Sequence, residues 1–427
     1  MAQRGIREYH GKKMIAKYWS EYFGGLKKYA GKIALIDAKT TIDTLVQRNP
    51  WLKTEKLAVK PDQLFGKRGK HNLILLNATF EQARKWIKER MNKEVTIGKT
   101  TGKLSHFLVE PFVPHERNKE YFVAITSNRQ GDVIHLSAHG GVDIEEVWDT
   151  VATIEVPILS SIDDIEIKRK LPKDIPNEEK DTITAFVKGL FKLYRDLGYA
   201  YLEINPLIST KEGLVPVDMV ARLDDTTQFA YGKKWGPLEF PAPFGRSLTT
   251  EEKFVKNIDE KSGASLKLTI LNQKGRVWTI VAGGGASVVY TDTIFDLGFK
   301  DQLANYGEYS GNPSTDETYQ YAKTIIDLMT REKDPKGKIL IIGGGIANFT
   351  DVAKTFTGII KALNEYRQKL IDNKVRIYVR RGGPNYQEGL KNMKDLGKTL
   401  GVPIEVFGPE AHMTSIVPMG LKERANK

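Results

Sequence analysis

The chain has 427 residues, a formal net charge of +12 and no cysteine. Disulfides, thiolate-bound metals and a cysteine nucleophile are therefore excluded, and the length predicts two or three domains. No apolar run approaches the length of a membrane span and the first residues lack a signal-peptide core, so we expect a cytoplasmic protein. Lys and Arg are scattered among Asp and Glu, which favours anionic small molecules over nucleic acid as ligands.

The first hundred residues predict a small α/β lobe with a basic loop. An amphipathic helix is expected over residues 6–22 and another helix over 79–91, with strands at 33–36, 57–61 and 73–76. Lys60 lies on the middle strand, and Arg68 follows in a loop flanked by glycines. Such a loop suits a polyphosphate. Taken by itself, it is more typical of an ordinary solvated basic loop.

A proline and a hairpin follow this lobe. Pro111 interrupts the apolar run of residues 106–113 directly after Glu110, which predicts a broken strand and a hinge between lobes. Strands at 121–126 and 133–136 flank a turn and predict a hairpin. Residues 139–143 predict a glycine turn leading into a helix, and a further helix is expected over 183–197.

The next predicted hairpin places two oxygen ligands side by side. Asn205 lies seven residues before Glu212 in the turn, and Asp218 lies six residues after it. Antiparallel pairing would bring Asn205 and Asp218 nearly opposite each other. A carboxylate and an amide oxygen suit Mg²⁺ completed by phosphates. Without a nucleotide nearby the pair would be an ordinary polar contact, but the basic loop and Glu110 favour the metal site.

After a connection rich in Gly, Pro and aromatic residues (230–250), the rest of the chain alternates strands with helices. Apolar runs at 277–282, 339–342 and 376–379 are each followed by glycines and a helical pattern, and the last strand is expected at 404–407. This pattern predicts a doubly wound parallel sheet with its glycine loops at the carboxyl ends of the strands.

The second and third loops predict an anion pocket. Asn348 and Thr350 stand where a helix N-cap belongs, with Asp351 in the first turn, and unpaired backbone amides there favour an anion. Arg380 and Arg381 lie on the third loop, where the guanidinium group of an arginine can donate two parallel hydrogen bonds to a carboxylate. Three loops and an arginine pair favour an anionic substrate over a set of empty tight turns.

Several strings of residues resemble a known family over essentially the whole chain. Lys60, residues 68–69, 110–113 and 203–206, and Asp218 resemble the ATP-grasp domain of the succinyl-CoA synthetase β subunit. Residues 281–290, 304–311, 341–350 and 379–389 resemble ATP-citrate lyase. The resemblance implies an α/β protein with an ATP-grasp nucleotide-binding domain over 1–240. A flavodoxin-like, doubly wound parallel-sheet domain of the CoA-ligase type would bind citrate over 241–427.

The resemblance also implies roles for individual residues. The residues expected to contact ATP are Lys60, Arg68, Gly69, Pro111, Val113 and Glu120, and Asn205 and Asp218 are expected to hold its Mg²⁺. The residues expected to bind citrate are Gly311, Asn348, Thr350, Tyr366 and Arg381. A structural cation site is expected at Asp259, Ser262 and Ala264.

One part of the family's machinery is missing from this sequence. In the family, ATP phosphorylates a histidine in a Gly-His-Ala-Gly loop, citrate takes the phosphoryl group, and CoA then gives citryl-CoA, which is cleaved to acetyl-CoA and oxaloacetate. None of the seven histidines lies in such a loop, and His139 precedes two glycines in the wrong order. No catalytic residue is therefore assigned here. A larger partner subunit is expected to carry the phosphohistidine, much of the site for the substrate CoA and the citrate-synthase-like domain.

The length corresponds to the smaller, A-type subunit of a split enzyme, equivalent to the N-terminal portion of the single-chain animal form. Three alternatives remain open. A nucleotide-binding subunit of citryl-CoA synthetase shares the first steps, and a succinyl-CoA synthetase subunit fits the citrate loops less well. A regulatory anion-binding subunit is disfavoured by the intact set of Lys60, Arg68, Asn205 and Asp218.

Overall fold

The computed structural model describes residues 3–141 and 148–421. The chain divides into two compact units, one ending at Ser247 and the other beginning at Leu248. The boundary expected after residue 240 lies, like this division, between helices α8 (Gln228–Trp235) and α9 (Thr250–Lys261). Within the described ranges, no helix combines the length and apolar character needed to cross a membrane.

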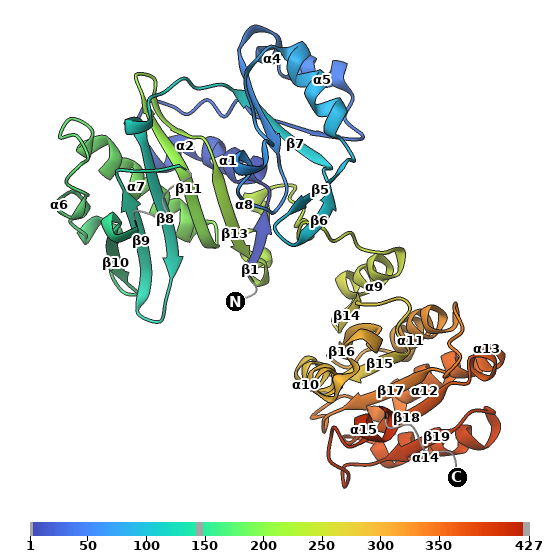
Figure 1. The fold of residues 1–427 in the computed structure, drawn as a ribbon. Coiled ribbons are helices and arrows are strands. Elements are labelled where there is room, and N and C mark those ends of the chain that lie inside the picture. Colours follow the sequence, from blue (N-terminus) through green and yellow to red (C-terminus); the bar gives the residue numbers. More distant parts are fainter. Residues whose placement is uncertain (1–2, 142–147, 422–427) are drawn as a thin grey trace. The chain divides into compact units, whose positions relative to one another are not determined.

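Antiparallel sheets organise the first unit (Figure 1). The strands are β1 (Gln3–Ile6), β2 (Ala34–Asp37), β3 (Leu57–Pro61), β4 (Leu75–Ala78), β5 (Glu94–Ile97), β6 (Thr100–Lys103), β7 (His106–Pro111), β8 (Glu120–Ser127), β9 (Gly131–Ser137), β10 (Ala152–Pro157), β11 (Tyr199–Thr210), β12 (Gly213–Pro216) and β13 (Met219–Asp224). The large sheet has the order β1-β13-β11-β8-β9-β10, with β12 paired to β11. The small sheet has the order β2-β7-β3-β4, and β5 pairs with β6 in a separate two-stranded sheet.

Helices bury one face of the large sheet. The helices of this unit are α1 (Glu8–Lys17), α2 (Trp19–Tyr22), α3 (Ile42–Arg48), α4 (Trp51–Thr54), α5 (Phe80–Arg90), α6 (Ile167–Lys170), α7 (Lys180–Asp196) and α8. On α7, Ile183, Val187, Leu190 and Tyr194 recur at helical spacing and pack into the main core with Ile15 of α1. Helix α1 is therefore held against the main core of this unit through Ile15.

The second unit has a six-stranded sheet of order β14-β16-β15-β17-β18-β19. Its strands are β14 (Ser265–Ile270), β15 (Val277–Ala282), β16 (Asn305–Ser310), β17 (Ile339–Gly344), β18 (Arg376–Arg380) and β19 (Ile404–Phe407). Its helices are α9, α10 (Gly284–Ile294), α11 (Thr315–Thr330), α12 (Val352–Glu365), α13 (Arg367–Asp372), α14 (Tyr386–Thr399) and α15 (Ile416–Leu421). Strand β14 is antiparallel to β16 and the other pairings are parallel.

The central strand β17 explains the continuous apolar run in the sequence. Leu340 and Ile342 belong to the core on one face of the sheet, whereas Ile339 and Ile341 belong to the core on the other. Both faces of a parallel sheet are covered by helices, so every position of the strand must be apolar. The predicted doubly wound architecture is confirmed, with one antiparallel edge strand.

Several predicted element boundaries are wrong. Ile6 ends strand β1 rather than beginning a helix, and the helical pattern after the second glycine loop is divided at Tyr366 into α12 and α13. The strand predicted at 73–76 is displaced to β4. Strand β7 continues through Glu110, which pairs with Ala58, and ends at Pro111. The helix predicted after Gly141 falls on residues outside the described ranges.

A glycine contact on α7 provides a test of this packing. A Cβ at Gly189 would lie 2.8 Å from Cδ1 of Phe23 and even closer to the carbonyl oxygen of Tyr22. We expect Gly189→Ala to destabilise the chain by about 1 to 3 kcal/mol in urea denaturation, because overpacking outweighs the helix propensity of alanine.

The matched control is Gly232→Ala on α8. Its Cβ would meet only the flexible side chain of Gln228, at 3.3 Å. This variant should be neutral or slightly more stable than the parent chain. Equal stability of the two variants would contradict the packing described for α7.

Candidate functional site

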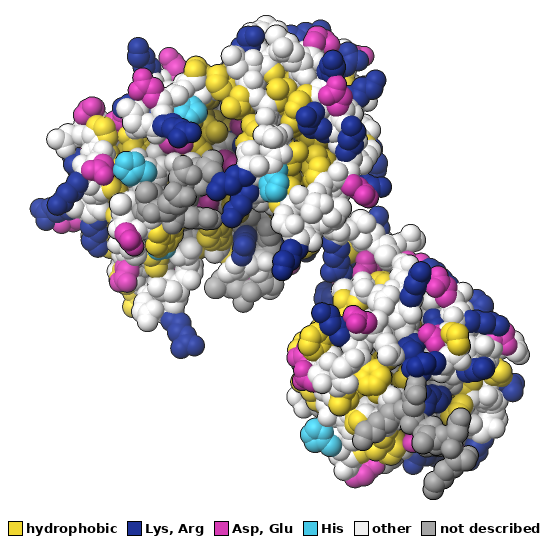
Figure 2. Space-filling model, in the orientation of Figure 1, with side chains coloured by type: hydrophobic (Ala, Val, Ile, Leu, Met, Phe, Trp, Pro, Cys, Tyr) yellow, Lys and Arg dark blue, Asp and Glu magenta, His cyan; other side chains and the backbone are white. Residues whose placement is uncertain are grey.

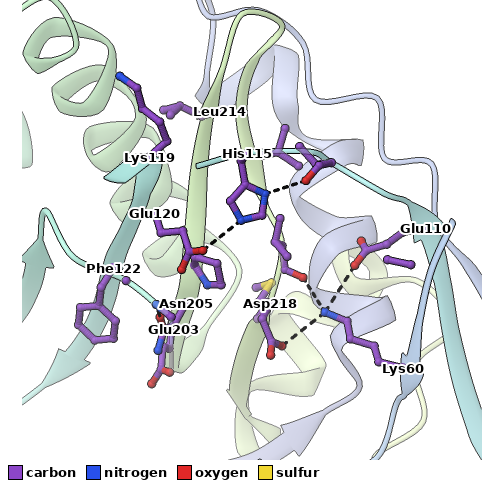
Figure 3. Close-up of a pocket in the computed structure, with 18 of the residues that line it drawn as sticks. Lys60, Glu110, His115, Lys119, Glu120, Phe122, Glu203, Asn205, Leu214 and Asp218 are labelled. Atoms are coloured by element: carbon purple, nitrogen blue, oxygen red, sulfur yellow. Dashed lines mark hydrogen bonds and ion pairs between the residues drawn. The ribbon is translucent and has the colours of Figure 1, made fainter. Parts of the chain in front are cut away.

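The first unit contains a cleft of about 1940 Å³ lined by both of its main sheets. Its walls include β3 and β7 of the small sheet and β8, β11 and β13 of the large sheet (Figure 3). Every residue predicted to contact ATP or its metal in this unit lines it: Lys60, Arg68, Gly69, Pro111, Val113, Glu120, Asn205 and Asp218. The folded chain therefore brings together residues that are spread over about 160 positions of sequence.

Two buried cations lie on the small-lobe side of the cleft. Lys60, near the end of β3, directs its Nζ to the carbonyl oxygen of Val217 at 2.6 Å and lies 3.7 Å from the carboxylate of Asp218. The Nη1 of Arg68 donates to the carbonyl of Pro61 at 2.9 Å, and its Nη2 is paired with Asp218. Both side chains are more than nine-tenths buried, so their charges need partners.

The predicted pair of oxygen ligands lies opposite these cations. The backbone N–H of Asn205 donates to the carbonyl of Asp218 at 2.9 Å, which confirms that the two strands place these residues side by side. The Oδ1 of Asn205 accepts the N–H of Gly141 at 2.5 Å. The Asp218 side chain is 33% exposed, so it is reachable from the cleft.

The segment after β7 carries the remaining nucleotide candidates and one residue that sequence reasoning missed. Pro111 ends β7, Val113 follows, and Glu120 begins β8. His115 bridges the last two, since its Nδ1 donates to the Val113 carbonyl at 2.7 Å and its Nε2 lies 3.1 Å from Glu120. A lone histidine in a loop gave no signal for this role.

Lysines and arginines elsewhere are spread over the visible surface (Figure 2).

Three glycine-containing loops lie at the carboxyl ends of parallel strands in the second unit, as predicted. Gly283 follows β15, residues 343–345 end β17, and residues 381–383 follow β18. Ile346 forms a bridge with Gly382, and the Ala347 N–H donates to the Gly382 carbonyl at 3.0 Å. The second and third loops are therefore joined by backbone hydrogen bonds.

The two predicted arginines have different surroundings. Arg380 donates to the carbonyls of Gly344, Pro409 and Ala411. It therefore links β18 to the end of β17 and to the segment after β19, and these donors are occupied. Arg381 donates from Nη1 to the Gly345 carbonyl at 2.8 Å, whereas its buried Nε has no hydrogen-bond partner in the described part of the chain. Arg381 therefore keeps more of its five N–H donors for an anion than Arg380 does.

The loop before α12 differs in detail from the prediction. Asp351 is the N-cap, because its Oδ1 accepts the N–H of Lys354 at 2.9 Å, so neither Asn348 nor Thr350 caps the helix. The Asn312 side chain, next to Gly311, accepts the N–H of Asp351 at 3.4 Å. The segment that contains Gly311 thus lies beside the segment of Asn348 and Thr350.

The remaining predicted residues have local partners in the structure. Tyr366 follows the last residue of α12 and donates to Asp327 at 3.1 Å, about 20 Å along the helix from Thr350. The carboxylate of Asp259 accepts the backbone N–H of Leu266 at 2.8 Å and pairs with Lys267 at 2.5 Å. Ser262 accepts the N–H of Ala264 at 2.9 Å. Local partners therefore occupy the residues expected to bind a structural cation.

Comparisons with known proteins cover both units. The family described as "ATP-citrate synthase ATP-grasp domain" matches residues 2–235, and that described as "ATP citrate lyase citrate-binding" matches residues 246–423. ATP-citrate synthase alpha chain protein 2 of Arabidopsis thaliana is 49% identical over 416 residues, covering 97% of both chains. ATP-citrate synthase of Bos taurus is 50% identical, but the chain spans only 39% of its length.

A solved structure is similar over the entire chain. It is described as ATP citrate lyase from Methanothrix soehngenii in complex with citrate and coenzyme A. It has 55% sequence identity and a TM-score of 0.92, and the match covers 99% of this chain and 100% of that one.

Proposed function

Because the chain belongs to the ATP-citrate lyase family, we propose that it is the subunit that binds MgATP and citrate for that enzyme. The γ-phosphoryl group of ATP passes to a histidine of a partner subunit and then to a carboxylate of citrate. CoA displaces phosphate from citryl phosphate, and cleavage of citryl-CoA yields acetyl-CoA and oxaloacetate. The partner supplies the histidine, much of the CoA site and the cleavage domain.

The observation that carries the proposal is the convergence of Lys60, Arg68, Asn205 and Asp218 in one cleft. Two buried cations suit the phosphates of a nucleotide, and the carboxylate and amide oxygens suit Mg²⁺. In the described residues, no group of three or more His, Asp or Glu side chains is placed to hold a metal by itself. Asn205 and Asp218 would hold the ion together with phosphate oxygens of the nucleotide, and its charge would neutralise those oxygens.

Binding involves an exchange of ion pairs. Asp218 is paired with Arg68 and lies 3.7 Å from Lys60. Lys60 and Arg68 would pair with the incoming phosphates, and the carboxylate of Asp218 would then hold the metal. Each charge keeps an opposite partner throughout, which avoids the cost of leaving a buried ion unpaired.

Citrate is assigned to the second unit. The loops around Gly311, Asn348 and Thr350 would surround it, and the free Nε of Arg381 would pair with a carboxylate. Arg380 contributes by fixing the loops through its three backbone carbonyls. Tyr366 lies at the opposite end of α12 and is left out of this pocket.

The proposal is tested with the purified chain and with its complex. Alone, the chain is expected to bind MgATP and citrate in calorimetric titrations but to form no acetyl-CoA. With the partner subunit, ATP, CoA and citrate should yield acetyl-CoA and oxaloacetate in equal amounts. Accumulation of citryl-CoA would instead indicate a citryl-CoA synthetase, and a chain that binds no MgATP would contradict the proposal.

Replacing Arg381 tests the citrate assignment. Arg381→Ala should weaken citrate binding by about 2 to 5 kcal/mol, at least about thirtyfold, because a buried charged contact is lost. Binding of MgATP should be unchanged, since that cleft is formed by the first unit. Succinate serves as a second ligand and is expected to bind poorly to the parent chain.

The control for this variant is Arg376→Ala on the same strand. The Arg376 side chain, at the amino end of β18, donates to the Gly420 carbonyl at 3.4 Å. Its loss should leave citrate affinity within about threefold. Equal loss in the two variants, or loss of both ligands in Arg381→Ala, would contradict the assignment.

Replacing Asp218 tests the metal assignment. The parent chain should bind ATP more tightly with Mg²⁺ than with a chelator, and Asp218→Asn should abolish most of this difference. Metal-free ATP should bind the variant as well as before or better, because Arg68 and Lys60 are released from the carboxylate. Calorimetry with and without Mg²⁺ measures both effects.

Asp224→Asn is the control for this experiment. Asp224 ends β13, the strand that begins directly after Asp218, and its side chain accepts the N–H of Thr226 away from the cleft. The Mg²⁺ enhancement should persist in that variant. If it also persists in Asp218→Asn, the metal lies elsewhere.

A further inference from the structure

A buried pair of opposite charges on α1 lies behind the nucleotide cleft. Glu8 and Lys12 are one helical turn apart, and their side chains are 2% and 0% exposed. Neither residue lines the cleft. Nothing assigned to the nucleotide, the metal or citrate uses them, although burying two ions is costly.

Glu8 contacts both of the buried cations in the cleft wall. One of its carboxylate oxygens lies 2.7 Å from Nζ of Lys60, and the other lies 2.9 Å from Nη2 of Arg68. The first oxygen is also 2.7 Å from Nζ of Lys12. A single carboxylate therefore joins β3, the loop that follows it and α1.

The backbone fixes where this carboxylate stands. Glu8 is the first residue of α1, and its N–H donates to Oδ1 of Asp62, directly after β3, at 2.9 Å. The N–H of Tyr9 donates to the other oxygen of Asp62 at 3.0 Å. The start of the helix is thus tied to the end of the strand that carries Lys60.

Lys12 completes the charge balance on the far side of Glu8. Its Nζ lies 2.7 Å from Glu110 and donates to the Val217 carbonyl at 2.7 Å. Burial by itself would raise the pKa of Glu8, but Lys12, Lys60 and Arg68 outweigh it and hold that pKa below its ordinary value. Glu8 is therefore a carboxylate in the folded chain.

We propose that Glu8 is a positioning residue for the nucleotide site, which holds Lys60 and Arg68 at the spacing that receives phosphate. The proposal rests on the function proposed above. In the ion-pair exchange, Asp218 leaves the cations for the metal, whereas Glu8 is outside the cleft and keeps its contacts with them. It would be the carboxylate that still joins the two cations and limits their mutual repulsion.

A purely structural role for Glu8 would be to neutralise Lys12. Two variants separate this role from positioning. Glu8→Asp keeps the charge but shortens the side chain by one methylene, so it cannot span Lys60 and Arg68 as before. The double variant Glu8→Gln/Lys12→Met removes both charges of the helix pair and leaves the total charge unchanged.

The experiment measures MgATP and citrate binding by calorimetry and thermal unfolding in the full chain. Both variants are expected to bind MgATP at least tenfold more weakly, with citrate affinity within about twofold of the parent. The matched control is Asp132→Asn, which removes a buried carboxylate that lies outside the cleft and 3.3 Å from Arg195. It should retain MgATP affinity.

The outcomes are distinguishable. Parent-like MgATP affinity in the double variant would show that Glu8 only neutralises Lys12 and would overturn the proposal. If the double variant does not fold, Glu8→Asp decides, and parent-like affinity there overturns the proposal equally. In the complex with the partner subunit, positioning predicts a raised KM for ATP and an unchanged KM for citrate. A parent chain that binds no MgATP contradicts the proposed function itself.

Discussion

The first unit depends on a balanced set of charges that are buried together. Lys12, Lys60 and Arg68 face the carboxylates of Glu8, Glu110 and Asp218. These side chains come from α1, β3, the loop after β3, β7 and the position directly before β13. An unpaired buried ion is strongly destabilising. Moving any one of these elements away would therefore lower the stability of the fold, because it would leave a buried charge unpaired. Lys60 and Arg68, the cations proposed to bind phosphate, are thus held in place by the same contacts that dock the N-terminal helix onto both sheets.

The second unit obeys a different constraint. A parallel sheet must be covered on both faces, which leaves its strand ends as the place where polar loops can gather. Joining those loops requires donors for their carbonyls, and Arg380 supplies three. Its neighbour Arg381 is held by one carbonyl and keeps a free Nε. Of these adjacent arginines, Arg380 links the loops, and Arg381 is the one that we propose to pair with a ligand carboxylate.

The sequence predicted what depends on local patterns. Strand β19, the apolar run of β17 and the approach of Asn205 to Asp218 follow from periodicity and from the length of one hairpin. The capping role of Asp351 was missed because three polar residues compete for one position. The role of Glu8 lies in contacts with residues 52 and 60 positions away, which no local pattern encodes. Tyr366 illustrates a different limit of the sequence. A resemblance between motifs does not tell at which end of a helix a residue lies, and Tyr366 follows the carboxyl end of α12.

The charge arrangement also bears on which anions the cleft accepts. Asp218 stands beside the two cations and is reachable from the cleft, so an anion that arrives without a metal meets a negative charge next to its binding groups. Coulomb repulsion between close like charges offsets part of the attraction to Lys60 and Arg68. In the proposed function, a divalent ion held by Asp218 would remove this repulsion. The proposal therefore assigns a metal-complexed polyphosphate to the cleft, and it assigns the carboxylate substrate to the loops of the second unit.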